Sequence, residues 1–342
     1  MNSMPVYILG IESSCDETSA SVTADGIILS NIVAGQDVHA RYGGVVPELA
    51  SRAHQQQIIP VVDAALREAG ISPSELHGIA FTRGPGLIGS LLVGCSFAKG
   101  MSLALKIPLI EVNHMQAHVI ANFAFRTDDV KIQPEFPFLC LTVSGGHTQL
   151  VVVNSYTEME VIGETRDDAA GEAFDKVAKM LNLPYPGGPF IDKFAAAGNP
   201  LAYKFPHPFA PDLDFSFSGL KTAVLYFLQK ERDRQPDFPG DKMADVCASV
   251  QHTIIEILLE KLKTAMRERG MREIALAGGV SANSGLRKRL TEEGQKNNWK
   301  VHIPPFEYCT DNAGMISVYG YYKFMKGDFC QNNVMPLARM PF

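Results

Sequence analysis

The sequence lacks the cysteine pairs that a disulfide scaffold or a zinc ribbon would need. In a chain of this length, scattered cysteines fit a reducing compartment, so we expect the protein to be cytoplasmic. The six cysteines form no Cys-x-x-Cys pair and lie at Cys15, Cys95, Cys140, Cys247, Cys309 and Cys330.

The sequence also lacks a long apolar run and a basic start. No apolar stretch approaches the roughly 20 residues that a membrane helix needs. The first apolar run, VYILGI, is short and continues directly into Glu12. We therefore expect neither a signal peptide nor a membrane association.

Positive charge is scarce as well. The 31 Lys and Arg residues are outnumbered by 37 Asp and Glu residues, which gives a formal net charge of −6. A protein that holds nucleic acid by itself usually presents a basic surface. If the substrate is a nucleic acid, we expect a partner to supply part of the positive charge.

What the sequence does contain is an internal repeat of predicted secondary structure. Its 342 residues, 46% of them hydrophobic, are enough for two domains with full cores. Residues 6–23 and 138–154 each read as a strand, a small polar turn and a second strand. Residues 79–105 and 274–290 each read as a strand, a Gly-rich turn and a helix, an order that can cradle a phosphate. The matched order predicts a duplicated α/β architecture with a cleft between two halves.

Apolar periodicity predicts further helices between these units. A charged stretch at 126–137 is expected to link the two halves, and Asp311-Asn312 stands at the N-cap position of the last helix. These helices are expected at 48–69, 171–182, 242–269 and 312–326.

Two histidines stand four residues apart in a stretch, 112–125, that reads as a helix. That spacing puts His114 and His118 on one helix face, which suits two metal ligands. The zinc-protease motif His-Glu-x-x-His needs a glutamate as general base, but Met115 occupies that position. The alternative is that both histidines are ordinary core or surface residues.

The ordered motifs of the chain resemble those of the tRNA N6-adenosine threonylcarbamoyltransferase family, the TsaD family. The resemblance covers nearly the whole chain. Its motifs are GIESSCDETS (10–19), HARYGGVVPELASRAH (39–54), NHMQAH (113–118), TVSGGHTQL (142–150), GEAFDKVAKMLNLPYPGGP (171–189), FSFSGLKTAV (215–224), LAGGVSAN (276–283) and CTDNAGMI (309–316).

The resemblance implies a duplicated RNase-H-like, actin-like α/β fold of two lobes, with a nucleotide and metal cleft between them. We expect one lobe at 1–130 and the other at 131–311, with residues 312–342 packing back on the first. The implied reaction transfers a threonylcarbamoyl group from threonylcarbamoyl-AMP to N6 of the adenosine at position 37, next to the anticodon, in tRNAs that read codons beginning with A, and it releases AMP. The implied partners are tRNA, an inactive TsaB-like paralogue, a TsaE-like ATPase and a TsaC-type synthase that makes the adenylate.

The resemblance also assigns the metal ligands. His114 and His118 match the family's metal-binding histidines, and Asp311 matches the third ligand, although the residues alone favour a helix cap for Asp311. Two histidines and a carboxylate leave open positions on one divalent metal, and the set suits Fe(II), which the family favours, or Zn(II). Many relatives carry an acid at Gln116, which puts a role for a carboxylate there in doubt.

Substrate-binding residues follow from the same resemblance. The turn after the second-lobe strand would bring backbone close to a phosphate, because Gly145 and Gly146 carry no side chain. From the residues alone, an ordinary hairpin turn is an equally open interpretation of the Ser-Gly-Gly loop, and a solvated position is the more usual one for an acid in the middle of a helix, such as Asp175. The residues that match family substrate contacts are Thr142, Val143, Ser144, Gly145, Gly146, Asp175, Gly188, Asp192 and Asn283.

Two acids of the first hairpin turn are candidates for catalysis. We hypothesise that Glu12 or Asp16 assists removal of the N6 proton, with surface turn acids as the alternative. Three rival functions have a different chemistry. A metalloprotease would need a base in place of Met115; a non-catalytic nucleotide-binding module would lack the metal triad; and an ATP-hydrolysing kinase or chaperone of the same fold would turn over ATP without tRNA.

Overall fold

The computed structural model describes residues 4–36, 39, 42, 44–126 and 132–342. The chain divides into two compact units, and each is described by itself. Unit 1 comprises residues 1–133, 154–159 and 304–342, and unit 2 comprises residues 134–153 and 160–303. The boundary expected at residues 130 and 131 lies outside the described residues.

Unit 1 is built on a five-stranded sheet in the order β3-β2-β1-β4-β5. The β3–β2 and β2–β1 pairs are antiparallel, whereas the β1–β4 and β4–β5 pairs are parallel. The predicted hairpin and the predicted strand–glycine–helix unit are both present. The elements are β1 (Tyr7–Glu12), β2 (Thr18–Ala24), β3 (Ile27–Ala34), α1 (Pro47–Ala69), β4 (Gly78–Gly84), α2 (Ile88–Leu105), β5 (Leu109–Asn113), α3 (His114–Ile120) and α9 (Ala313–Lys326).

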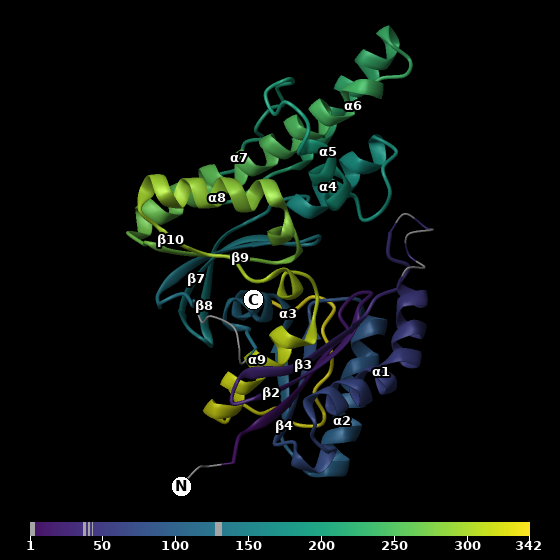
Figure 1. Ribbon diagram of the computed structural model, residues 1–342, viewed down its shortest axis with the longest axis vertical. Coiled ribbons are helices and arrows are strands. Elements are labelled where there is room, and N and C mark those ends of the chain that lie inside the picture. The colour runs from purple at the N-terminus through teal and green to yellow at the C-terminus, as the bar shows by residue number, and fades with distance from the viewer. Residues whose placement is uncertain (1–3, 37–38, 40–41, 43, 127–131) are drawn as a thin grey trace. The chain divides into compact units, whose positions relative to one another are not determined.

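The sheet of unit 1 lies between two layers of helices, α1 and α2 on one face and α9 on the other (Figure 1). Successive side chains of a strand point to opposite faces. Leu9 and Ile11 enter a core with α1 and α2, while Gly10 lies directly against α9. A Cβ on Gly10 would stand 2.5 Å from the backbone nitrogen of Ser317, so the sheet can meet α9 only where β1 lacks a side chain.

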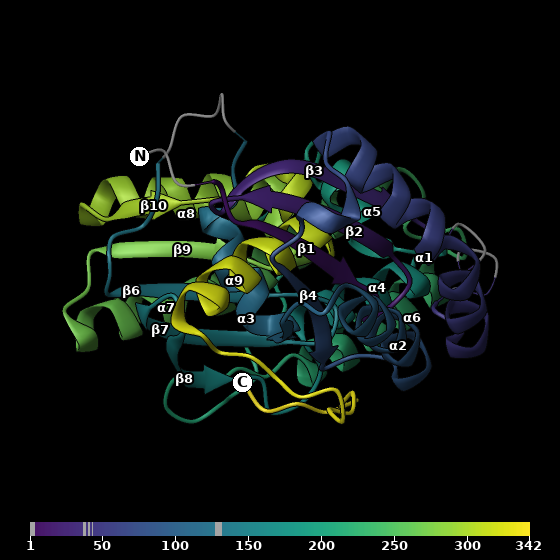
Figure 2. The same ribbon diagram turned by 90° about the horizontal axis from the view of Figure 1, so that it is seen from below.

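Unit 2 repeats the same strand plan. Its sheet has the order β10-β9-β6-β7-β8, with an antiparallel β6–β7 pair and parallel β6–β9 and β9–β10 pairs (Figure 2). Helix α7 supplies much of the core beneath it. The elements are β6 (Phe138–Val143), β7 (Thr148–Ser155), β8 (Glu158–Glu164), α4 (Ala170–Met180), α5 (Gly187–Ala195), α6 (Ser218–Arg234), α7 (Met243–Arg269), β9 (Glu273–Ala277), α8 (Ser284–Asn297) and β10 (Lys300–His302).

The duplicated α/β plan predicted from the sequence is confirmed, and one helix prediction is wrong. The stretch 112–125 is not one helix, because Val112 and Asn113 complete β5 and α3 begins at His114. The helix ends after seven residues, at Ile120, where a 3-10 turn follows. Among the described residues, 3-10 segments lie at Pro73–Glu75, Ala121–Phe123, Gly240–Lys242, Gly279–Ala282 and Phe306–Tyr308.

Helix α2 is unusually apolar. Among the described residues it is the one helix long and apolar enough to cross a membrane by length and composition, and a third of it is buried. A single helix of this kind is weak evidence for a membrane span. Its buried face is accounted for by packing in the unit 1 core, where Cys95 and Ala98 lie.

Candidate metal centre

The two histidines are positioned by the junction of β5 and α3. Asn113 ends the strand and caps the helix, since its side-chain oxygen accepts hydrogen bonds from the backbone nitrogens of Met115 (2.9 Å) and Gln116 (3.2 Å). His114 is therefore the first residue of α3, and His118 stands one turn later. The imidazole centroids are 4.7 Å apart and the rings are nearly perpendicular.

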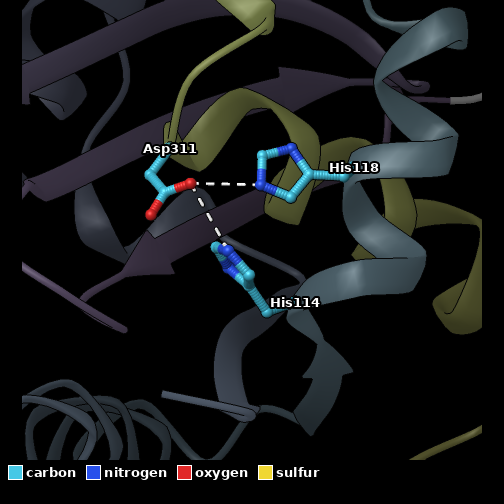
Figure 3. Close-up of side chains that lie close together, drawn as sticks. All are labelled: His114, His118 and Asp311. Atoms are coloured by element: carbon cyan, nitrogen blue, oxygen red, sulfur yellow. Dashed lines mark hydrogen bonds and ion pairs between the residues drawn. The ribbon is translucent and has the colours of Figure 1, made fainter. Parts of the chain in front are cut away.

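Asp311 comes from the loop that leads into α9 and turns its carboxylate towards both rings (Figure 3). Its Oδ1 lies 3.1 Å from Nε2 of His118 and 3.4 Å from Nε2 of His114. All three residues belong to unit 1.

The helix-cap alternative for Asp311 is wrong, because α9 finds its acceptors elsewhere. The amide of Ala313 donates to Oγ of Ser19 (2.8 Å), and that of Gly314 donates to Oδ1 of Asn31 (3.0 Å). The true N-cap is Asn312, whose Oδ1 accepts from the backbone nitrogen of Met315 at 3.2 Å. The carboxylate of Asp311 is thus left to face the histidines.

This donor set fits a divalent metal ion. One ligand atom from each of His114, His118 and Asp311 lies within 4.8 Å of the others. Two imidazole nitrogens and one carboxylate oxygen are ligands that Zn(II) and Fe(II) both accept, and three protein ligands leave coordination positions open. Metal binding to the two Nε2 atoms would leave Nδ1 of each ring for a partner in the protein. Within the described residues, Nδ1 of His118 is buried without a hydrogen-bond partner, whereas Nδ1 of His114 has one.

Glu12 is that partner for His114. Its Oε2 lies 3.0 Å from Nδ1 of His114 and accepts a hydrogen bond from Oγ1 of Thr82 at 2.6 Å. Its Oε1 accepts from the backbone nitrogen of Ser14 at 2.5 Å. The side chain is fully buried. A carboxylate held in this way fixes the ring and keeps the proton on Nδ1, so that Nε2 presents its lone pair to a metal.

The electrostatics follow from this burial. Burial by itself raises the pKa of Asp311, but the charge of His114 and hydrogen bonds from both histidines outweigh it and hold the pKa well below its usual range. Burial likewise opposes ionisation of Glu12, yet interaction with His114 lowers its pKa overall. In return, the pKa of His114 is raised well above its usual value: burial would lower it, and the charges of Asp311 and Glu12 override that effect.

The sequence does not single out Glu17, which lies in the same turn as Asp16. Burial, followed by the charges of Asp311 and Asp16, raises the pKa of Glu17 to about 9. Glu17 is therefore protonated at neutral pH and adds no further negative charge beside Asp311. Its only signal in the sequence is its place among three acids in six residues. Asp16 itself is half-buried.

The residues predicted to bind substrate lie in unit 2. Thr142 and Val143 are buried at the end of β6, and the turn beyond them is closed by a hydrogen bond from the backbone nitrogen of Ser144 to the carbonyl of His147 (2.8 Å). Gly145 and Gly146 are exposed, with no atom within 4 Å of a Cβ built on either. The turn is therefore open to a ligand.

Two of the predicted acids cap helices. Oδ1 of Asp175 accepts from the backbone nitrogens of Gly187 (2.7 Å) and Gly188 (3.3 Å) at the start of α5. Asp192 accepts from the backbone nitrogen of Ser284 (2.9 Å) at the start of α8. Burial raises the pKa of Asp175, although those two glycine amides oppose the shift.

Asn283 is also engaged within the protein. Its Oδ1 accepts from the backbone nitrogen of Leu286 (2.8 Å), and its Nδ2 donates to Oε1 of Gln251 (2.7 Å). The side chain is buried, so it shapes the start of α8. An asparagine just before a helix, as Asn283 is before α8, can be recognised as an N-cap from the sequence. The hydrogen bond from Asn283 to Gln251 cannot.

Several known proteins with similar sequences share one name. A family model described as TsaD, tRNA N6-adenosine threonylcarbamoyltransferase, matches residues 27–318. A tRNA N6-adenosine threonylcarbamoyltransferase from Christiangramia forsetii is 59% identical over 342 residues, which is 100% of both chains. Another from Cytophaga hutchinsonii is 57% identical and covers 99% of this chain and 97% of its own. The chain belongs to the TsaD family. The predicted family and its transferase class are thereby confirmed.

More distant solved structures share the fold. Component A of the Acidaminococcus fermentans (R)-2-hydroxyglutaryl-CoA dehydratase has a TM-score of 0.52 at 14% identity and covers 93% of this chain and 98% of its own. Full-length HypF, in its phosphate- and nucleotide-bound form, has a TM-score of 0.61 at 13% identity, over 96% of this chain and 48% of its own. At such identities the likeness concerns the fold alone, and it confirms the predicted actin-like class.

Replacing Glu12 by Gln should weaken metal binding. The variant keeps the shape of the side chain but loses the charge that holds the proton on Nδ1 of His114, and changes of this kind reduce metal affinity by roughly 10- to 100-fold. Zinc affinity can be measured by competition with a chromophoric chelator. The matched control is Glu48→Gln, which removes an exposed carboxylate paired with Arg52 on α1. Equal affinities in the two variants would show that Glu12 does not orient His114.

Metal affinity should fall as the pH falls. His114 has a raised pKa in the metal-free protein, so below that pKa a metal must displace its proton, and affinity drops by up to about tenfold per pH unit for each displaced proton. Asp311 stays ionised in this range because its pKa is lowered. Titration calorimetry at pH 7 in two buffers of different ionisation enthalpy counts the protons released. We expect about one in the wild type, and none would contradict the assignment of His114.

Proposed function

We propose that this chain transfers the threonylcarbamoyl group of threonylcarbamoyl-AMP to N6 of the adenosine next to the anticodon, in tRNAs that read codons beginning with A. The observation that carries the proposal is the presence, in a TsaD-family chain, of a His114–His118–Asp311 cluster with the geometry of a metal site, in which both histidines are buried. The cofactor is one divalent metal, with Fe(II) favoured and Zn(II) as the alternative.

Little covalent work is asked of the protein. The acyl donor is already activated, with AMP as its leaving group, whereas the adenine N6 lone pair is delocalised into the ring and attacks poorly. The site must therefore position the amine against the carbamoyl carbon and stabilise charge on the leaving phosphate. A bound metal would supply Lewis-acid polarisation of the donor. His114, His118 and Asp311 would hold it, and Glu12 would keep His114 in the binding tautomer.

The open turn of unit 2 is the proposed phosphate subsite. Gly145 and Gly146 expose their backbone, so an anion can approach the amides without meeting a side chain. Gly171 supports the turn from below, because a Cβ there would lie 2.5 Å from the carbonyl oxygen of Ser144. Asp175 uses only Oδ1 in capping α5; within the described residues its Oδ2 has no hydrogen-bond partner, which leaves that oxygen for a ribose or threonyl hydroxyl.

Asp192 and Asn283 act differently in this proposal. Both oxygens of Asp192 and both ends of the Asn283 amide are bonded within unit 2. These side chains therefore shape the start of α8, and a nucleotide would meet the backbone that they hold in place. Gly188 plays the corresponding part at the start of α5.

Of the two acids hypothesised to remove the N6 proton, Asp16 suits the task better. Glu12 is buried and all of its hydrogen bonds go to protein groups. A general base must reach the proton that it abstracts. Asp16 is half-buried and keeps a path to solvent, so it is our candidate for the base.

The rivals fit the structure less well. Met115 is buried within α3 and carries no basic atom, so it cannot replace the glutamate of a zinc protease. A non-catalytic nucleotide-binding module would not need the three metal-binding residues His114, His118 and Asp311, all of which are present. The ATP-hydrolysing rival predicts ATP turnover without tRNA, which the reaction proposed here does not require of this chain.

Partners complete the reaction. The acidic chain would bind tRNA weakly alone, so we propose that an inactive TsaB-like paralogue and a TsaE-like ATPase assist it in the cytoplasm, with a TsaC-type synthase providing the adenylate. The outer face of α2 is suited to the paralogue. Ile88, Leu92 and Leu103 follow helical spacing on one stripe, and each is at least 41% exposed. An exposed apolar stripe of this kind commonly marks a protein interface.

Transfer of radiolabelled threonine tests the function. The label should enter an A-codon-reading tRNA transcript in the presence of ATP, bicarbonate, the synthase, both partners and this chain, and it should be absent when this chain is omitted. His114→Ala should abolish labelling, because the cluster loses one ligand. Labelling that survives in His114→Ala would keep the transferase and assign the cluster a structural role. No label with partners proven active would favour the nucleotide-binding module.

Replacing Leu92 by Glu should disrupt the partner interface. A charge buried without a counterion at an interface weakens association by roughly tenfold or more. Complex formation with the TsaB-like protein can be followed by size-exclusion chromatography and light scattering. Leu201→Glu is the control, because Leu201 is equally apolar and 69% exposed but lies in unit 2. If both variants bind the paralogue like the wild type, α2 is not the interface.

A further inference from the structure

The segment after α9 runs back over the edge of unit 1 that carries α3. Residues 328–342 form no named helix or strand, and they are the yellow coil beyond α9 in Figure 2. The backbone nitrogen of Leu337 donates to the carbonyl of Arg83 (2.9 Å), and that of Gly86 donates to the carbonyl of Ala338 (3.2 Å). These two bonds anchor the segment beside the end of β4.

The fit at this anchor is close. A Cβ on Gly84 would lie 2.0 Å from the carbonyl oxygen of Leu337 and 3.3 Å from Cβ of Met340. The sequence thus leaves out a side chain where the segment crosses β4. Because the backbone at Leu337 lies so close to Gly84, the segment can cross β4 only at this glycine. This contact determines the position of the residues that follow.

Those residues arrive at Asn113. Its side-chain nitrogen Nδ2 donates to the carbonyl oxygen of Pro341 at 2.8 Å. The other end of the same amide, Oδ1, caps α3 through Met115 and Gln116. Asn113 is 4% exposed, so water cannot easily replace either contact. One planar group therefore joins residue 341 to the helix that carries the two histidines.

The acceptor at residue 341 decides which way this amide faces. An asparagine side chain offers a donor end and an acceptor end of nearly equal shape. With the Pro341 carbonyl present, the NH₂ end has an acceptor and the oxygen must face the amides of Met115 and Gln116. Without that carbonyl, the buried NH₂ loses its partner, and the cap loses the contact that holds it in this orientation.

We propose that residues 339–342 position the metal centre: the Pro341 carbonyl orients Asn113, and Asn113 in turn fixes the start of α3 and the rings of His114 and His118. This inference rests on the metal site of the proposed function. Asn113 and Pro341 are positioning residues, since neither would touch the metal or a substrate.

Truncation after Ala338 isolates the contact, because both anchoring hydrogen bonds remain. Loss of one buried hydrogen bond should weaken zinc binding by roughly 2- to 10-fold in a chelator competition. The control is Arg339→Ala, which changes an exposed side chain and keeps the Pro341 carbonyl, and it should bind zinc like the wild type. Wild-type affinity in the truncated chain would overturn the proposal.

A double-mutant cycle separates positioning from general destabilisation. Asn113→Asp keeps an oxygen that can cap α3 but has no hydrogen to donate to Pro341. If the segment acts through Asn113, truncation should cause no further loss of zinc affinity in the Asn113→Asp background. The same loss in both backgrounds would mean that the segment acts by another route, and the proposal would fail.

Hydrogen exchange of the metal-free protein supplies a readout that needs no metal. The amides of Met115 and Gln116 should exchange roughly 2- to 10-fold faster in the truncated chain and at the wild-type rate in Arg339→Ala. Unchanged exchange in the truncated chain would overturn the positioning role even if the wild type binds zinc. Faster exchange in a chain whose wild type binds no zinc would support the Pro341–Asn113 link while refuting the metal site on which the proposed function depends.

Discussion

Buried helix N-termini must find hydrogen-bond acceptors, and the metal centre exists because α9 finds its acceptors away from Asp311. Ser19 and Asn31 reach across from β2 and β3 to the first amides of α9, and Asn312 supplies the cap. An acid just before a helix would ordinarily serve as that cap itself. Because the sheet takes over the task, the carboxylate of Asp311 can turn towards α3.

The same constraint shapes unit 2, where acids from other segments cap three helices. Asp175 of α4 caps α5, Asp167 caps α6 through the amides of Phe217 and Ser218, and Asp192 of α5 caps α8. Each carboxylate gains favourable contact with a helix dipole as well as hydrogen bonds. Asp175 and Asp192, which the sequence suggests as substrate ligands, thus also connect neighbouring helices by hydrogen bonds.

The sequence was informative where periodicity and motif order decide the outcome. The strand–turn–strand and strand–glycine–helix repeats predicted both sheets, and the spacing of His114 and His118 predicted their shared face. It was less informative where long-range contacts decide. Nothing local shows that Asn113 ends a strand and caps a seven-residue helix, and for this reason the helix predicted at 112–125 was too long.

The protonation states of the acids near the metal centre also could not be predicted from the local sequence. Glu12 and Glu17 stand five residues apart and both are buried, which opposes ionisation. The interaction with His114 lowers the pKa of Glu12 overall, whereas the charges of Asp311 and Asp16 add to the effect of burial and keep Glu17 protonated at neutral pH. The two cases differ in their neighbours: a histidine contacts Glu12, whereas the charges that shift the pKa of Glu17 come from other acids. The candidate site therefore depends on the contact between Glu12 at the end of β1 and His114 at the start of α3, which neither segment of the sequence specifies by itself.

Gln116 shows how the same reasoning bears on a single departure from the family pattern. Its Oε1 accepts a hydrogen bond from the Tyr319 hydroxyl at 2.8 Å, which ties α3 to α9 at a residue between the two histidines in the sequence. A carboxylate there would add a third negative charge, on the helix that carries the two histidines. The neutral amide makes the tie without that charge, so the two ionised carboxylates are balanced by His114 or by a bound cation alone. In this chain residue 116 therefore serves the spacing of the two helices rather than the charge of the metal centre.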